Sequence, residues 1–187
     1  MVSLGALWLP ILVAAALVFV ASSLIHMVLP YHRSDYGKVV AEDQVMDALR
    51  PFAIAPGDYM VPCPTSPAGA QAPDFVAKAK RGPVILMTVL PSGQMSMVSN
   101  LVWWFVFCIV VGVFAGYLTS RALPPGAPYR EVFRFAGTVA YVGYALALWE
   151  NTIWYKRAWT TTLKSNVDGL IYSLLTGGVF GWLWPQA

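Results

Sequence analysis

Four side chains that can ligate a metal ion lie inside or beside long apolar stretches of this sequence. They are two imidazoles and two carboxylates, at His26, His32, Glu150 and Asp168. Imidazole nitrogen and carboxylate oxygen suit iron, copper or zinc. A charged group in apolar surroundings also needs a partner, so a Glu–Lys or Glu–His pair without metal is the structural alternative. The sequence therefore predicts a candidate transition-metal site and leaves simple charge pairing open.

Other cofactor chemistry fits the sequence less well. A b-type haem needs axial ligands on opposite sides of the ring, whereas His26 and His32 come from one short stretch. Against a shared metal site, the spacing of the two histidines is no recognised ligand pattern, and Pro30 lies between them. Thioether sulfur binds Cu(I), but among the methionines only Met95 and Met97 are closely spaced, and methionine usually fills gaps in apolar packing. No GxSxG, P-loop, GxGxxG or HExxH motif occurs in the chain. No class of enzyme is therefore indicated.

Composition identifies the environment of these residues. Of 187 residues, 58% are hydrophobic and 11% are charged, whereas soluble globular proteins carry about 25% charged residues. The mean hydropathy is +0.61. The net charge is +3, and the basic residues are scattered, which argues against a nucleic-acid partner. These values predict an integral membrane protein whose main partner is the lipid bilayer.

Four apolar segments are long enough to cross a membrane as helices. We expect an all-α membrane protein in which four transmembrane helices form a compact bundle, at residues 1–29, about 100–120, 133–155 and 168–184. Rows of small residues at helical spacing favour close helix packing. One such row, Ala136, Ala140, Gly143 and Ala147, ends at Glu150. This pattern predicts that Glu150 points into protein.

The polar region 30–97 is predicted to form a small α+β extramembrane cap between the first and second helices. It contains the patterns of a helix at 41–50, a strand at 58–61, one or two helical turns at 74–81 and a strand at 83–91. With four spans, this cap and the polar connection 156–167 lie on the same side of the membrane. The four candidate ligands then gather at the cap-side end of the bundle. When Arg33 and Lys38 are counted, the cap side has more basic residues near the span ends than the other side, which favours a cytoplasmic cap.

Several segments resemble a family of small bacterial integral membrane proteins with four spans and no assigned activity. The matching residues are 26–35 (HMVLPYHRSD), 57–60 (GDYM), 168–172 (DGLIY) and 180–185 (FGWLWP). The resemblance implies a multi-pass protein of the bacterial inner (cytoplasmic) membrane. It implies no activity and no functional residues.

The sequence thus favours a non-enzymatic accessory or assembly subunit of a larger membrane complex, packed against other membrane protein subunits or against itself. Small-residue faces on three of the spans motivate this expectation. The alternative is a metal-binding or redox membrane protein that uses His26, His32, Glu150 and Asp168. A membrane enzyme with its site under the cap is a third hypothesis.

Overall fold

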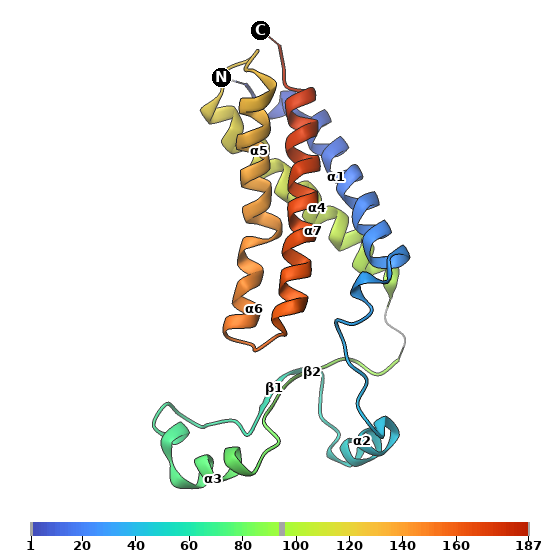
Figure 1. Cartoon of the computed structure of the whole chain (residues 1–187), viewed down its shortest axis with the longest axis vertical. Helices are drawn as coiled ribbons and strands as arrows, with labels where there is room; N and C mark the ends of the chain where they lie inside the picture. Colours follow the sequence, from blue (N-terminus) through green and yellow to red (C-terminus); the bar gives the residue numbers. More distant parts are fainter. Residues whose placement is uncertain (1, 94–95, 187) are drawn as a thin grey trace. The chain divides into compact units, whose positions relative to one another are not determined.

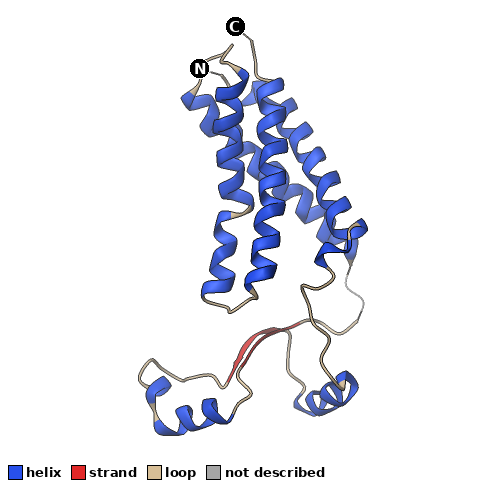
Figure 2. Cartoon of the chain, in the orientation of Figure 1, coloured by secondary structure: helices blue, strands red, loops and turns tan. Residues whose placement is uncertain are grey.

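The computed structural model describes residues 2–93 and 96–186, and the chain divides into two compact units (Figure 1). One unit consists of Met1–Gly37 together with Ser96–Ala187, and the other is Lys38–Met95. Figure 2 shows that helix dominates and that the sheet consists of two short strands. Residues 30–37, which the sequence analysis assigned to the cap, thus belong to the unit that contains the long helices.

The long helices lie in the first unit. They are α1 (Trp8–Ser23), α4 (Met97–Ala122), α5 (Tyr129–Tyr144) and α7 (Trp159–Trp182). A 3-10 turn precedes α1 and a π-turn follows it, so one helical stretch runs over Leu4–Val28. Among the described residues, three stretches are long and apolar enough to cross a membrane: Leu4–Val28, Met97–Ala122 and Tyr129–Ile153. The chain is therefore a helical protein with three membrane-length apolar helices.

Small residues allow the long helices to approach one another closely. Helix α5 packs along α7, α1 packs against α4 and α7, and α4 packs against α5. A Cβ atom on Gly177 of α7 would lie 2.8 Å from the carbonyl oxygen of Phe133, and one on Gly112 of α4 would lie 3.3 Å from the side chain of Ile11. The small-residue faces predicted from the sequence are thus used for packing inside this chain.

The third apolar segment is interrupted, which corrects two predictions. Helix α5 begins at Tyr129 and ends at Tyr144, Ala145 leaves helical geometry at φ −130°, and a 3-10 turn (Leu146–Leu148) leads to the short helix α6 (Trp149–Ile153). The 3-10 turn has three residues per turn, so it breaks the alignment of the predicted face. Consequently Ala140 is buried, whereas Glu150 is exposed. The span predicted at 133–155 overlaps the candidate span Tyr129–Ile153, but it is not a single unbroken helix. The predicted burial of Glu150 is wrong.

The last helix begins earlier than predicted. Helix α7 starts at Trp159, so most of the expected polar connection 156–167 is helical and only the link 154–158 joins it to α6. Polar side chains at its start are buried because they find partners. The hydroxyls of Thr162 and Thr152 lie 2.5 Å apart, and the Asn166 amide donates to the Thr162 carbonyl at 3.0 Å. Asp168 therefore lies within the helix, not at its start.

The second unit contains the elements that the sequence predicts for 41–91. They are α2 (Glu42–Leu49), β1 (Gly57–Val61), α3 (Pro73–Arg81) and β2 (Ile85–Val89). The two strands are antiparallel, with Gly57 opposite Val89 and Val61 opposite Ile85. Every residue of α2 and α3 is at least partly exposed. Met95, one of the two closely spaced methionines, lies outside the described residues.

Candidate metal centre

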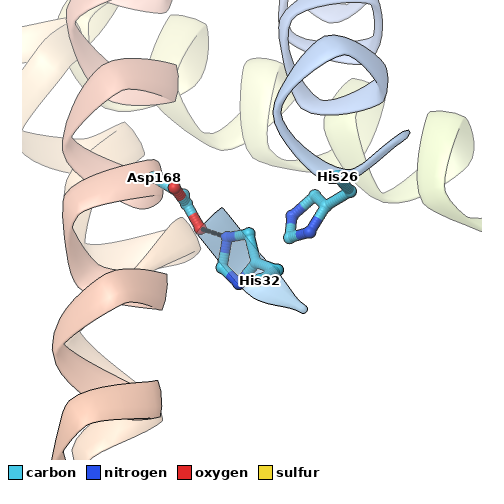
Figure 3. A group of neighbouring side chains, drawn as sticks. All are labelled: His26, His32 and Asp168. Carbon is cyan, nitrogen blue, oxygen red and sulfur yellow. Dashed lines mark hydrogen bonds and ion pairs between the residues drawn. The ribbon is translucent and has the colours of Figure 1, made fainter. Parts of the chain in front are cut away.

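Three of the four predicted ligands meet where the end of the first helical stretch approaches the middle of α7 (Figure 3). One ligand atom from each of His26, His32 and Asp168 lies within 4.8 Å of the others. His26 lies in the π-turn Leu24–Val28, His32 ends the 3-10 turn Pro30–His32, and Asp168 lies in α7. Three separate elements therefore supply the donors of a candidate site, which we call the His–His–Asp cluster.

The irregular end of the first helical stretch brings the two histidines together. The π-turn is a wider turn than α-helix, and Leu29 is extended because proline follows it. Pro30 then starts a 3-10 turn that folds the chain back. As a result the two imidazole rings lie 4.2 Å apart between centroids, with an angle of 31° between their planes. Pro30 therefore places the histidines side by side, although the sequence analysis took it as evidence against a shared site.

His32 is held between two carboxylates. Its Nε2 lies 2.8 Å from Oδ2 of Asp168, and its Nδ1 lies 2.6 Å from Oδ2 of Asp35. Both ring nitrogens can donate only when the ring is an imidazolium, because neutral imidazole has one N–H. Metal-bound histidines commonly donate their second ring N–H to a carboxylate, which fixes the ring. The contact of His32 Nδ1 with Asp35 would play this role if Nε2 of His32 bound a metal.

Lys164 fixes the segment that carries His32. Its ammonium group donates to Oδ1 of Asp35 at 2.9 Å, to the Ser34 hydroxyl at 2.8 Å and to the Tyr31 carbonyl at 2.8 Å. The Tyr31 hydroxyl donates in return to the Lys164 carbonyl at 3.1 Å. These contacts tie the segment 31–35 to α7. Sequence reasoning missed Lys164 because it placed this residue in a connection, whereas in α7 it lies one turn before Asp168.

These charges also shift the pKa values of the two loop groups. Burial acts to raise the pKa of the Asp35 carboxyl, but the hydrogen bonds and positive charges of His32 and Lys164 outweigh burial and lower that pKa below its usual value. Burial, together with the nearby carboxylates of Asp168 and Asp35, raises the pKa of the Tyr31 hydroxyl. Asp35 is therefore an ionised acceptor for His32 at neutral pH.

One oxygen of Asp168 lacks a partner. The residue is only 3% exposed, and its Oδ2 faces His32, but its Oδ1 has no hydrogen-bond partner among the described residues. A buried polar atom left unpaired costs about 1 to 3 kcal/mol, and more when it is charged. This oxygen is therefore the position in the His–His–Asp cluster where a cation would be stabilised most.

The fourth predicted ligand does not join the cluster. Glu150 is exposed on α6 and lies outside the group of donors within 4.8 Å. Its neighbour Asn151 donates to the Leu148 carbonyl at 3.4 Å, within its own turn. The carboxylate predicted to organise the site is therefore exposed, because the 3-10 turn between α5 and α6 breaks the alignment of the predicted face.

The cluster is close to the geometry of a metal site. Bonds of about 2.0 to 2.2 Å to a tetrahedral ion place donor atoms roughly 3.3 Å apart. Donor atoms separated by the full 4.8 Å would therefore have to approach one another by about 1.5 Å to hold such an ion. His26 is exposed at the rim, and its Nε2 has a long contact of 3.5 Å with the Tyr172 hydroxyl, so its ring is the donor that can move.

Comparison with protein-family models, curated protein sequences and solved structures finds no match to this chain. The resemblance to bacterial four-span proteins therefore stays a prediction. The roles of His26, His32 and Asp168 rest on their geometry alone.

Proposed function

We propose that this protein binds a divalent transition metal at His26, His32 and Asp168, with Asp35 as the partner that orients His32. The observation that carries the proposal is the buried Asp168 carboxylate, whose Oδ1 is unpaired beside two imidazoles. A cation at this position would satisfy that oxygen and replace the proton between His32 and Asp168. The proposal is the metal-binding alternative of the sequence analysis, without Glu150.

The donor set narrows the choice of metal. Two imidazoles and one carboxylate are typical ligands of zinc sites that keep an open position, and of non-haem iron(II) sites. Both ions tolerate three protein ligands with water or a substrate in the remaining positions. Copper(II) also binds imidazole but favours a tetragonal arrangement. We therefore favour zinc or iron(II), and a redox role requires iron.

The proposed membrane arrangement has four spans. Helix α7 has 24 residues and is about 36 Å long, which exceeds the hydrocarbon thickness of about 30 Å. It packs along α5 and α1, and its charged residues Lys164 and Asp168 have partners inside the protein, which lowers the cost of placing these residues in a membrane.

The resemblance supports a bacterial inner membrane, and the basic residues support a cytoplasmic Lys38–Met95 unit. Labelling of the exposed thiol Cys63 by an impermeant maleimide in intact cells tests on which side of the membrane this unit lies, and a cytoplasmic Cys63 should stay unlabelled.

The accessory role in a larger complex stays a prediction. This role was predicted from the glycine-rich faces of the helices. In the structure, glycines of these faces such as Gly112 and Gly177 contact other helices of the same chain. They are therefore not available to a partner subunit. Mass measurement after purification in mild detergent tests this role, and a lone monomer counts against it.

The metal proposal is tested by elemental analysis of the purified full-length chain. The protein is stripped with a chelator, reloaded with Zn²⁺ or Fe²⁺, and desalted. We expect about one ion per chain, as for other sites with three protein ligands. Asp168→Asn and His32→Ala should lose the ion.

Glu150→Gln is the matched control, because Glu150 is an acidic residue of the same unit outside the cluster. It should keep full metal content. Monodisperse elution of Asp168→Asn from a sizing column shows that the variant has folded. The proposal fails if the reloaded wild-type chain holds no stoichiometric metal, or if folded Asp168→Asn holds as much as the wild type.

A further inference from the structure

A groove on the outer face of α5 and α7 combines an apolar surface with the guanidinium of Arg134. Its volume is about 270 Å³, and its lining residues are Phe133, Arg134, Gly137, Thr138, Tyr141, Leu170, Ser173 and Leu174. It belongs to the candidate span Tyr129–Ile153, so it lies on a surface that we expect to face lipid. The His–His–Asp cluster contributes no residue to it.

Small residues form the floor of this groove. Gly137 has no side chain, and α5 and α7 approach so closely there that a Cβ on Gly137 would lie 3.4 Å from the Ser173 carbonyl oxygen. The Ser173 hydroxyl donates to the Leu170 carbonyl at 2.8 Å within its own helix, so it offers no free donor. The exposed side chains of Leu170 and Leu174 line the groove from α7. The result is a shallow apolar channel along the helix pair.

The length of the channel suits a flexible hydrocarbon chain. Its lining on α5 extends from Phe133 to Tyr141, eight residues along the helix. At 1.5 Å per residue this distance is about 12 Å. An acyl chain can follow such a channel, because its affinity comes from buried CH₂ groups at about 0.8 kcal/mol each and requires no directed contacts.

Arg134 supplies the charge at one end of the channel. It is exposed and, among the described residues, it forms no ion pair or hydrogen bond, although the exposed Glu131 lies one turn earlier on α5. A guanidinium within a spanning helix is costly unless it reaches the interface or meets an anion. Guanidinium groups bind phosphate with two parallel hydrogen bonds.

We propose that this groove binds one acyl chain of an anionic phospholipid whose phosphate group is held by Arg134. The channel provides the apolar contact, and the guanidinium selects the negatively charged headgroup. The site is independent of the metal proposal, because the two share no residue.

Native mass spectrometry of the full chain tests the proposal. The protein is released from membranes that contain equal amounts of phosphatidylglycerol and phosphatidylcholine, and the retained lipids are identified. Both lipids offer a phosphate to Arg134, but the choline cation of phosphatidylcholine cancels its charge and repels a guanidinium. We therefore expect about a tenfold preference for phosphatidylglycerol, whose headgroup keeps a net negative charge. Arg134→Gln should abolish the preference. Thr138→Trp, which fills the groove from an exposed position, should reduce retention of both lipids.

Arg157→Gln is the control for charge in general, because Arg157 is an exposed arginine in the link 154–158, far from the groove along the sequence. It should leave the preference unchanged. The proposal is overturned if the wild-type chain retains both lipids equally, since such binding is that of bulk lipid only. It is also overturned if Arg134→Gln keeps the tenfold preference while eluting as a folded protein.

Discussion

Two long helical stretches of this protein end irregularly, with opposite results for the residues that follow. At the end of Leu4–Val28, the π-turn Leu24–Val28 and then Pro30 fold the chain back, and His32 Nε2 lies 2.8 Å from the buried Asp168. After α5, the break at Ala145 leads into α6, where Glu150 is exposed. Both residues are polar and both were expected at the same site. The comparison teaches that the conformation of a helix end, not residue type, decides which polar groups are buried together.

The largest expected effect contrasts the two acids. Asp168→Asn removes the charge that His32 faces in a buried position, and breaking a buried pair costs about 3 kcal/mol or more. Glu150→Gln alters an exposed side chain and should change stability by less than about 0.5 kcal/mol. Denaturant unfolding of the metal-free protein in detergent measures both. Equal destabilisation by the two substitutions would show that Glu150 has a buried role.

A second prediction concerns the cause of the break in α5. A Cβ on Gly169 would lie 2.6 Å from Cβ of Ala145, a contact that cannot form without movement of the backbone. Gly169→Ala should therefore destabilise the protein by about 1 to 3 kcal/mol. Gly178→Ala is the matched control on the same helix, since its Cβ would lie 3.7 Å from the nearest atom.

Alanine favours helix over glycine by up to about 1 kcal/mol, so Gly178→Ala should be neutral or stabilising in thermal unfolding. If Gly169→Ala is equally well tolerated, the contact between Ala145 and α7 does not set the end of α5.

The sequence predicts the parts of this fold that depend on local signals. The apolar runs at 1–29 and 100–120 correspond to Leu4–Val28 and α4, and the two strands of the second unit follow from turn residues and β-branched runs. The break after Tyr144 has only a weak local signal, because Gly143 is the one poor helix former in the run Tyr141–Leu148 and the helix continues through it. The close contact at the break comes from Gly169, a residue distant in sequence. The polar connection predicted over 156–167 is mostly helical, and its Thr162 pairs with Thr152 of α6.

In the candidate site, too, the sequence identifies some residues, whereas the contacts between them depend on tertiary structure. His26, His32 and Asp168 were chosen by residue type and by the side of the membrane on which they were expected, which is coarse information. The contribution of Lys164 depends on where α7 begins, and the stacking of the two histidines depends on the π-turn. Neither feature has a sequence pattern that distinguishes it from an ordinary helix end.

A third prediction tests how firmly the segment that carries His32 is held. Lys164→Met keeps an apolar side chain of similar length but removes three hydrogen bonds and leaves Asp35 with His32 as its remaining charged partner. The lysine side chain is 20% exposed, so water replaces part of the loss, and we expect destabilisation of about 1 to 2 kcal/mol.

Lys156→Met is the control, because Lys156 is exposed and its ammonium donates to the Ile153 carbonyl at 2.9 Å, within its own turn. It should change stability by less than about 0.5 kcal/mol. Chemical denaturation compares the two variants. A Lys164→Met protein as stable as Lys156→Met would mean that the 31–35 segment is held mainly by His32.

The smallest effect is expected at Pro30, and it bears most directly on the comparison of the two helix ends. Proline at the start of a turn restricts the unfolded chain, so Pro30→Ala should cost about 0.4 to 1 kcal/mol while leaving the contacts of His32 intact. The informative measurement is amide hydrogen exchange over residues 29–35, compared with residues 145–150. Exchange should rise in the first segment and stay unchanged in the second. A uniform rise in both would mean that proline stabilises the whole unit, and the fold-back of His32 onto α7 would then be encoded by the Lys164 and Asp168 contacts alone.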